Sequence, residues 1–267
     1  MTLDVAAAPG ARTMKLPVTA CIITYNEEHN IRDCLRSVEW ADEVVVVDSH
    51  SKDRTVEIAR EFTDKVVRRE WNGINDQRRF AQDQAGHEWV FNLDADERAS
   101  AELAREIASL DLESRDIDGY LVPRRAFYLG RWIKHGGWYP DYKLRLYRKA
   151  KARFLDNDPH DTVELDGRTA RLSGEIEHYT YRDISDQLAQ IQKFSTTRAE
   201  QFMRSGRKFS YLQLLFRPPW KFFNTYILRL GLLDGMAGLI ISALSAYHVF
   251  VTWAKFWELT RKPEVKE

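Results

Sequence analysis

Short apolar runs alternate with helix-like segments over the first hundred residues. Apolar runs that are buried on both faces are typical of parallel strands. We expect strands at 18–24, 44–47, 65–69 and 89–93, separated by helices at 31–38, 51–62 and 75–85. The alternation predicts an α/β domain in which helices cover both faces of a parallel sheet.

The pattern changes after residue 119. Further β segments are expected at 119–129, 142–148 and 170–179, and helices follow from residue 183. We therefore divide the chain into a flexible tail at 1–14, an α/β domain at 15–181 and helices at 182–267. The tail lacks the long apolar core and basic start of a signal peptide, so we expect a cytoplasmic protein.

Composition excludes several classes of protein. The chain has 267 residues, 40 basic and 40 acidic side chains, and two cysteines. Two cysteines exclude a disulfide framework and a cysteine zinc site. Residues 1–115 carry 15 basic and 23 acidic side chains, whereas residues 116–267 carry 25 and 17. This split argues against a generic nucleic-acid binder, and we expect no nucleic-acid partner.

Polar side chains follow three of the expected strands, at 24–27, 48–49 and 94–97. Ligands of parallel sheets bind beyond the carboxyl ends of the strands. The turn after the first strand has no glycine, so a dinucleotide-type glycine loop is excluded. A divalent ion is the other common way to hold phosphates, and Asp94 and Asp96 offer oxygen ligands for Mg²⁺ or Mn²⁺.

Other Asp-x-Asp triplets occur at 116–118 and 156–158, and most such triplets are only polar loops. The triplet at 94–96 differs because it follows a buried strand. Burying two carboxylates at this position costs free energy unless a metal or ligand binds them.

These strand ends together resemble the family 2 glycosyltransferases of GT-A fold. The resemblance rests on Thr24-Tyr25-Asn26-Glu27, on Val47-Asp48-Ser49 with Ser51-x-Asp53-x-Thr55, and on Leu93-Asp94-Ala95-Asp96-Glu97. It extends through His160-Asp161, 176–179 and 233–239 to the branch of lipopolysaccharide core β-1,4-glucosyltransferases. That branch usually has Glu where this chain has Asp161. The implied fold is a Rossmann-like mixed sheet with flanking helices, and the implied catalytic domain is 15–181.

The resemblance implies an inverting transfer of a hexose, glucose in this branch, from a UDP-sugar to a lipopolysaccharide-core or other lipid-linked acceptor. It implies a metal held by Asp94, Asp96 and His178, and a general base at Asp161. The alternative for His178 is a structural histidine, and that for Asp161 is an acidic turn. Glu97 is a second candidate base.

The expected nucleotide-sugar site gathers residues from all three strand ends and from the helix before the Asp-x-Asp strand. They are Thr24, Tyr25, Asn26, Glu27, Asp48, Ser49, Gln77, Arg78, Asp94 and Ala95. Asp48 is the strongest of these, because a carboxylate accepts from a base N–H or from ribose hydroxyls. A turn role for Asp48 and a solvated helix face for Arg78 are the alternatives.

A basic stretch lies between the Asp-x-Asp triplet and Asp161. Residues 124–153 contain ten basic side chains and one acid. Such runs are usually solvated faces, but this one lies where an acceptor must approach. Arg145 and Arg148 are therefore candidates for anionic acceptor groups, and Trp138 and Tyr139 for a sugar ring. Aromatic packing is the alternative for the last two.

The C-terminal helices suggest a membrane surface. Residues 182–229 carry nine basic and three acidic side chains among many aromatics, which suits an anionic bilayer. We expect 217–220, which contains two prolines, to break a helix. Residues 235–254 have no charge and are just long enough to span a bilayer, but a stripe of small and polar residues favours a helix in the interface. We expect peripheral or monotopic attachment at the cytoplasmic face of the inner membrane. The alternative is a helix packed on the catalytic domain.

Three rival functions remain at this point. A polyprenyl phosphate could be the acceptor, a scaffold could have kept the fold without catalysis, or the chain could be a glycoside hydrolase. A hydrolase needs an acid paired with a nucleophile or base and has no need of nucleotide-facing strand ends.

Overall fold

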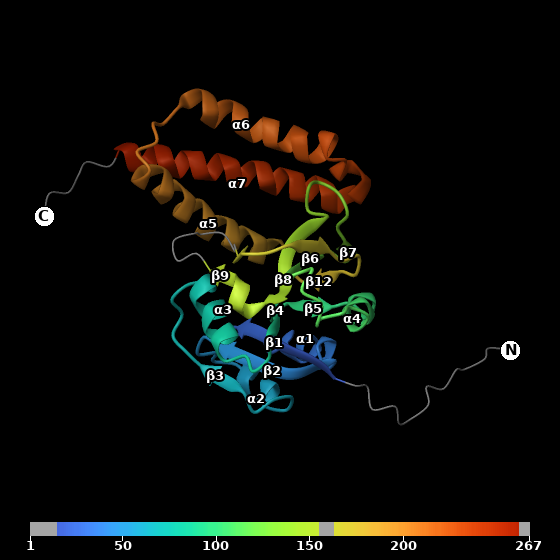
Figure 1. Cartoon of the computed structure of the whole chain (residues 1–267). Helices are drawn as coiled ribbons and strands as arrows, with labels where there is room; N and C mark the ends of the chain where they lie inside the picture. The colour runs from blue at the N-terminus through green and yellow to red at the C-terminus, as the bar shows by residue number, and fades with distance from the viewer. Residues whose placement is uncertain (1–14, 155–162, 262–267) are drawn as a thin grey trace, which may run out of the picture. The chain divides into compact units, whose positions relative to one another are not determined.

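The computed structural model describes residues 15–154 and 163–261. The chain forms two compact units, coloured along its length in Figure 1. Unit 1 holds the described residues of Met1–Val122 and Lys143–Ile176, and unit 2 those of Pro123–Tyr142 and Glu177–Glu267. The expected tail at 1–14 lies outside the described residues, as does Asp161. The division of the chain at residues 181 and 182 stays a prediction.

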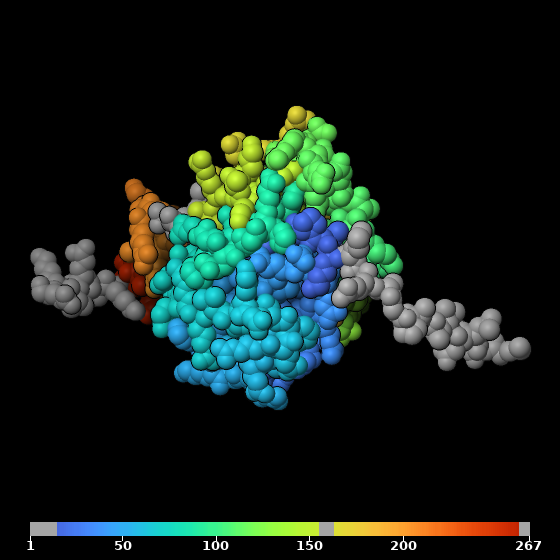
Figure 2. Space-filling view, turned by 60° about the horizontal axis from the view of Figure 1, so that its bottom comes forward, coloured from blue at the N-terminus to red at the C-terminus, as the bar shows by residue number. Residues whose placement is uncertain are grey.

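Unit 1 is the expected α/β unit, and residues 15–100 form a continuous blue to blue-green surface in Figure 2. Its elements are β1 (Leu16–Thr24), α1 (Ile31–Ser37), β2 (Ala41–Asp48), α2 (Thr55–Ala59), β3 (Val66–Arg68), α3 (Ile74–Asp83), β4 (Trp89–Asp94), β5 (Glu97–Ala99), α4 (Ala101–Ala108), β6 (Gly119–Tyr128), β8 (Asp141–Arg148), η1 (Lys149–Lys151), β9 (Ala152–Phe154), β10 (Val163–Leu165) and β11 (Thr169–Arg171). β6 and β8 also extend into unit 2.

The sheet of unit 1 is mixed. Its strands lie in the order β3-β2-β1-β4-β8-β6, with β11 beside β6. β1, β2, β3 and β4 are parallel, and β8 is antiparallel to β4. This arrangement confirms the expected mixed α/β sheet with flanking helices.

Successive residues of β1 pack into two different cores, as the apolar run predicts. Ala20 and Ile22 belong to a core that α1 covers, whereas Cys21 and Ile23 belong to a core that includes Ala81 of α3. Because successive side chains of a strand point to opposite faces, these two cores lie on the two sides of the sheet. Helices on both faces hold the carboxyl ends of β1, β2 and β4 in a fixed frame.

Unit 2 is mainly helical. It contains β7 (Arg131–Trp132), most of β12 (Ile176–His178), α5 (Ile184–Arg204), α6 (Tyr211–Phe223), the π-helix η2 (Asn224–Leu228), the 3₁₀-helix η3 (Gly231–Asp234) and α7 (Gly235–Arg261). α7 packs against both α5 and α6 and lies between them in Figure 1. It is the helix within the described residues whose length and apolar composition would allow it to cross a membrane.

The expected helix break at 217–220 does not occur. α6 continues through Pro218 and Pro219 to Phe223. Each proline removes one backbone N–H from the helix, so the carbonyls of Leu214 and Leu215 lose their usual donors. None of the residues of α6 is buried, so this loss occurs in a helix that is not enclosed by the core.

The contacts of the buried Asp234 carboxylate give the Leu233-Asp234-Gly235-x-x-Gly238 motif a structural role. Asp234 is 1% exposed and accepts from the backbone N–H of His135 at 2.8 Å and of Lys134 at 3.2 Å. Arg131 donates to the carbonyl of Asp234 at 2.8 Å. A Cβ on Gly238 would lie 1.8 Å from the carbonyl oxygen of Gly231, so only glycine fits there. The motif therefore ties the start of α7 to the segment after β7.

Candidate functional site

Three strand ends meet at one edge of the unit 1 sheet. Thr24, at the end of β1, is paired in register with Asp48 at the end of β2. Its neighbour Ile23 is paired with Asp94 at the end of β4. The structure thus brings together polar groups that are up to 70 residues apart in the sequence. We refer to this edge, with the turns that leave it, as the strand-end site.

The turn after β1 is held from behind by the Ser51-x-Asp53-x-Thr55 motif. The backbone N–H of Asn26 donates to Ser51 Oγ at 2.8 Å, and that of Glu27 donates to Thr55 Oγ1 at 2.8 Å. The next N–H, of Glu28, donates to Asp53 Oδ2 at 3.1 Å. Three side chains spaced two apart therefore satisfy three consecutive amides of a turn that has no regular structure.

Asp53 is the charged member of this support. Burial raises its pKa, but hydrogen bonds from Thr55 and from backbone amides outweigh burial and hold the pKa below its ordinary value. The carboxylate is thus matched to donors from Thr55 and Glu28. The sequence shows the motif, but its role as the support of the β1 turn emerges only from the contacts.

The backbone of the turn itself is sharply bent. Asn26 has φ of 55°, a left-handed conformation that asparagine tolerates better than most residues. Its side-chain Oδ1 accepts from the backbone N–H of Lys52 at 2.8 Å. Glu27 Oε2 accepts from Asn30 at 2.8 Å, and Tyr25 is 53% exposed. The turn therefore presents Tyr25 outward, while its other side chains help to fix its shape.

Two buried oxygens at the strand-end site lack partners. Within residues 15–154 and 163–261, Thr24 Oγ1 and Asp48 Oδ1 are buried and make no hydrogen bond. Asp48 is fully buried, and its other oxygen accepts from the backbone N–H of Ser51 at 2.9 Å. Burying such groups without partners is costly, so a ligand with hydrogen-bond donors fits this position.

Ser49 and Gln77 form a buried bridge beside Asp48. Gln77 is fully buried on α3 and donates to Ser49 Oγ at 3.0 Å and to the carbonyl of Glu70 at 3.0 Å. Ser49 donates its backbone N–H to the carbonyl of Thr24 at 2.9 Å. Both residues lie at the expected edge, and their contacts here hold β1, β2 and α3 together.

Asp94 is engaged by Arg78. The guanidinium of Arg78, 2% exposed on α3, donates to Asp94 Oδ1 at 2.6 Å and Oδ2 at 2.8 Å. The alternative of a solvated helix face for Arg78 is therefore wrong. Ala95 is buried and donates its N–H to the carbonyl of Ile23 at 3.2 Å, and Asp96 follows it in a half-buried turn.

Glu97 lies behind the Asp-x-Asp turn rather than at its surface. It is fully buried, with Oε1 2.7 Å from Arg145 Nη2 and Oε2 3.0 Å from the backbone N–H of Asp94. Arg145 is itself 1% exposed and lies 3.6 Å from Asp94 Oδ2. A carboxylate held by two donors and closed to solvent is poorly placed to take a proton from a substrate.

Cys34 packs beneath the same turn. Its Sγ donates to the carbonyl of Asp94 at 3.5 Å. Burial raises the pKa of this thiol, and the nearby carboxylates of Glu97, Asp96 and Asp94 raise it further. The residue is therefore a neutral packing group at physiological pH, not a nucleophile.

The donor set at the Asp-x-Asp turn suits Mg²⁺ or Mn²⁺. The described residues hold no group of three or more histidines, cysteines or carboxylates that is arranged to hold a metal ion. Asp94 and Asp96 supply oxygen ligands only, and a hard cation that also binds substrate phosphates needs no more than one or two carboxylates from the protein. His178 belongs to unit 2, so its part in a metal site stays a prediction.

The four residues expected to meet an acceptor fall in different places. Arg148 lies at the opposite end of β4 from Asp94, because it pairs with Trp89, and it donates to the carbonyls of Leu112 and Ser114 at 2.9 and 2.7 Å. Arg145 belongs to the buried network described above. Neither side chain is open to solvent in this structure.

Trp138 and Tyr139 belong to unit 2. Trp138 is half-buried, with its ring 6.0 Å from that of Tyr128 and 6.3 Å from that of Tyr181. Burial raises the pKa of Tyr128 to about 12, and its hydroxyl donates to Gln187 at 2.6 Å. The aromatic packing that the sequence left open is thus present at Trp138.

Comparison with known proteins agrees with this architecture. Residues 19–164 match the model of the family described as Glycosyl transferase family 2. The chain is 31% identical to the lipopolysaccharide core biosynthesis glycosyltransferase LpsC of Rhizobium meliloti, over 95% of this chain and 97% of that protein. It is 32% identical to an uncharacterized glycosyltransferase of Rickettsia typhi, over 92% and 88%.

Among solved structures, the chain resembles the mannosyltransferase PcManGT from Pyrobaculum calidifontis, solved in complex with GDP-Man and Mn²⁺. The TM-score is 0.54 at 16% identity, over 98% of this chain and 92% of that one. At this identity the likeness concerns the fold alone. The family match and the full-length likeness to LpsC show that the chain is an enzyme of glycosyltransferase family 2.

Proposed function

We propose that this glycosyltransferase moves a hexose, with inversion, from a UDP-sugar to a lipopolysaccharide-core or other lipid-linked saccharide. The observation that carries the donor part is the presence of two buried oxygens without hydrogen-bond partners, Thr24 Oγ1 and Asp48 Oδ1, at two strand ends that are paired in register. A uracil base and a ribose offer N–H and O–H donors of the kind these oxygens need. The likeness to LpsC supports the acceptor part.

Different residues of the chain bind different parts of the donor. Asp48, Thr24 and the exposed Tyr25 bind the nucleoside, on a turn whose shape is set by Asn26, Glu27 and the supporting motif. Mg²⁺ or Mn²⁺, held by Asp96, Asp94 and His178, would neutralise charge on the diphosphate leaving group. Arg78 and Arg145 keep the carboxylates of this turn paired and oriented.

Inversion requires a base on the face of the sugar opposite the leaving group. We assign it to Asp161, which lies outside the described residues. Its carboxylate takes the proton of the acceptor hydroxyl as that oxygen attacks the anomeric carbon. The burial of Glu97, with both of its oxygens bonded, favours Asp161 over Glu97 for this step.

A lipid-linked acceptor places the enzyme at a membrane. We propose that it works at the cytoplasmic face of the inner membrane, attached peripherally or monotopically. The basic and aromatic helices of unit 2 support this location.

The test is a transfer reaction with UDP-glucose and a truncated lipopolysaccharide core, in the presence of Mn²⁺. We expect UDP release that depends on the acceptor, and a product whose NMR spectrum shows the β-anomeric linkage from the α-linked donor. Asp161→Asn should lower kcat at least about a hundredfold, the usual contribution of a general base, with donor affinity unchanged.

Asp158→Asn, three positions earlier in the sequence, is the matched control and should retain activity. Equal activity of the two variants would remove Asp161 from the mechanism. Transfer to a bare polyprenyl phosphate would replace the proposed acceptor, and no turnover with any UDP-sugar would reject the proposed donor.

A further inference from the structure

α6 is unusual among the described helices of its length because it buries nothing. None of its 13 residues is buried. Six large apolar side chains are exposed by 44 to 68% of their surface, namely Tyr211, Leu212, Leu215, Phe216, Trp220 and Phe223. A contiguous apolar surface of this kind marks an interaction site more often than a solvated face.

The exposed apolar surface continues beyond α6. The turn that leads into α7 adds Ile227, Leu228, Leu230, Leu232, Leu233 and Met236, each at least 40% exposed. We call α6 together with residues 227–236 the hairpin surface. The hairpin surface is wider than one helix face, because it combines α6 with the turn that follows it and the first residues of α7.

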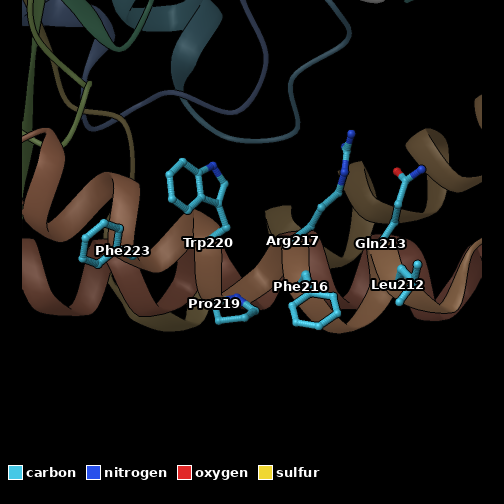
Figure 3. Close-up of a pocket in the computed structure, with 7 residues that line it drawn as sticks. All are labelled: Leu212, Gln213, Phe216, Arg217, Pro219, Trp220 and Phe223. Carbon is cyan, nitrogen blue, oxygen red and sulfur yellow. The ribbon is translucent and has the colours of Figure 1, made fainter.

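Side chains leave α6 in two directions. Leu212, Phe216 and Pro219 point to one side, whereas Gln213, Arg217 and Trp220 point to another, and the residues together line an open groove (Figure 3). The first side is wholly apolar. The second carries polar groups at the ends of long side chains, an arrangement typical of helices that lie at a lipid–water boundary.

The positive charge in and around the hairpin surface favours an anionic lipid surface as its partner. Residues 205–233 contain five basic side chains and no acidic one. The basic residues are Arg207, Lys208, Arg217, Lys221 and Arg229. Apolar residues among positive charges fit an anionic lipid headgroup layer over acyl chains. A second copy of this surface would bring like charges together and is disfavoured.

The packing of α7 argues against a transmembrane orientation. α7 packs against α5, and Lys255 of α7 donates to the carbonyl of Gln192 at 2.8 Å and to Ser195 Oγ at 2.9 Å. A spanning α7 would carry α5 into the bilayer with its charged residues, which are Asp186, Lys193, Arg198, Glu200 and Arg204. That burial is costly in hydrocarbon.

The two prolines of α6 also argue against a position of this helix at the centre of a bilayer. The carbonyls of Leu214 and Leu215 lack the i+4 donor of a regular α-helix, because Pro218 and Pro219 have no N–H. Water in the headgroup layer can satisfy these carbonyls, whereas the centre of a bilayer cannot.

We propose that the hairpin surface inserts in the plane of an anionic lipid leaflet, with α6 as the membrane-contacting helix and α7 as the helix that anchors it to the rest of unit 2. This deepens the membrane location proposed above but needs neither the donor nor the acceptor assignment. Vesicle binding is measured without sugars, so its failure is distinct from a failure of the proposed transfer.

The experiment uses the full chain and vesicles of phosphatidylcholine, with or without phosphatidylglycerol, in a sedimentation assay. We expect binding only to the anionic vesicles. Phe216→Ser should weaken it about tenfold, the value of one buried aromatic side chain. Arg217→Gln should weaken it about fivefold, the value of one basic residue at such a surface. Phe194→Ser is the matched control, because Phe194 is 52% exposed on α5.

A fluorescent label gives a second measurement that does not depend on loss of binding. Cys21 and Cys34 are buried, so Phe216→Cys and Phe194→Cys can be labelled selectively with an environment-sensitive dye. We expect a blue shift at 216 and none at 194 when anionic vesicles are added. Equal shifts at both positions, no shift at 216, or a shift at 216 that follows protein concentration without vesicles would each overturn the proposal.

Discussion

Arg78 Nη2 lies 2.6 Å from one carboxylate oxygen of Asp94 and 2.8 Å from the other. The first aspartate of the Asp-x-Asp turn is therefore oriented by a buried guanidinium from the helix that precedes its strand. We expect Arg78→Met to cost about 3 kcal/mol in the free energy of unfolding, because it removes the two short hydrogen bonds that hold the Asp94 carboxylate. Urea denaturation measures this.

The control for that variant is Arg79→Met on the same helix. Arg79 is half-exposed and pairs with Asp76 at 3.1 Å. Solvent screens a partly exposed pair of this kind, so the free energy should change by less than about 0.5 kcal/mol. Equal losses in the two variants would contradict the special role of Arg78.

We propose that Glu97 supports the Asp-x-Asp turn and does not act as the base. We expect Glu97→Gln to lower stability and to weaken metal-dependent donor binding, because the amide cannot accept from both Arg145 and the Asp94 N–H as the carboxylate does. A general base would give the opposite split, with kcat lost and donor affinity kept. Steady-state kinetics with isothermal titration separates the two, and the second pattern would contradict our assignment.

Thr55→Val tests the support of the β1 turn. The variant keeps the shape of the side chain but removes the acceptor of the Glu27 N–H. We expect a loss of about 1 kcal/mol in unfolding free energy, together with weaker UDP binding. Thr197→Val, on an exposed face of α5, is the matched control and should alter neither quantity. An unchanged UDP affinity in Thr55→Val would show that the Ser51-x-Asp53-x-Thr55 motif does not contribute to nucleotide binding.

Glu43 makes the stability of unit 1 dependent on acid pH. Burial raises its pKa, but hydrogen bonds from Lys65, Thr19 and the Gly86 N–H lower it from 4.5 to about 2. Since the folded-state pKa is depressed, the stabilisation is complete above pH 4.5 and is lost as pH falls toward 2.

We expect Glu43→Gln to lower the unfolding free energy by about 1.5 kcal/mol at neutral pH, a value reduced for solvent screening of the partly exposed Lys65. The difference from the native chain should shrink toward zero near pH 2. Denaturation curves across this range measure it. Glu39→Gln, at an exposed position, should show no such trend, and a difference independent of pH at Glu43 would refute the assignment.

The sheet and its polar edge could be predicted from the sequence because both follow from local pattern. The apolar runs of β1, β2 and β4 place Thr24, Asp48 and Asp94 at their ends, and parallel pairing brings those ends together. What could not be predicted is which polar residues support others. Glu97 meets Arg145 from 48 positions away, and no local pattern encodes that pairing.

Two further differences between the sequence-based expectations and the structure have clear physical causes. Arg148 lies in the same basic run as Arg145, but antiparallel pairing of β8 with β4 carries it to the far end of the strand, beside Trp89. The prolines at 218 and 219 were expected to end a helix, yet α6 continues to Phe223, and none of its residues is buried. In each case the outcome depends on tertiary surroundings and not on residue type.

The measurement that tests the central claim most directly is calorimetric binding of UDP, GDP and ADP, with and without Mn²⁺. We expect UDP to bind the native chain in a metal-dependent manner and to be preferred over GDP and ADP. Asp96→Ala should abolish the metal dependence, and Asp48→Asn should weaken UDP binding with or without the metal. Absence of binding by any nucleotide, or UDP binding unaffected by both substitutions, would contradict the assignment of the strand-end site to the donor.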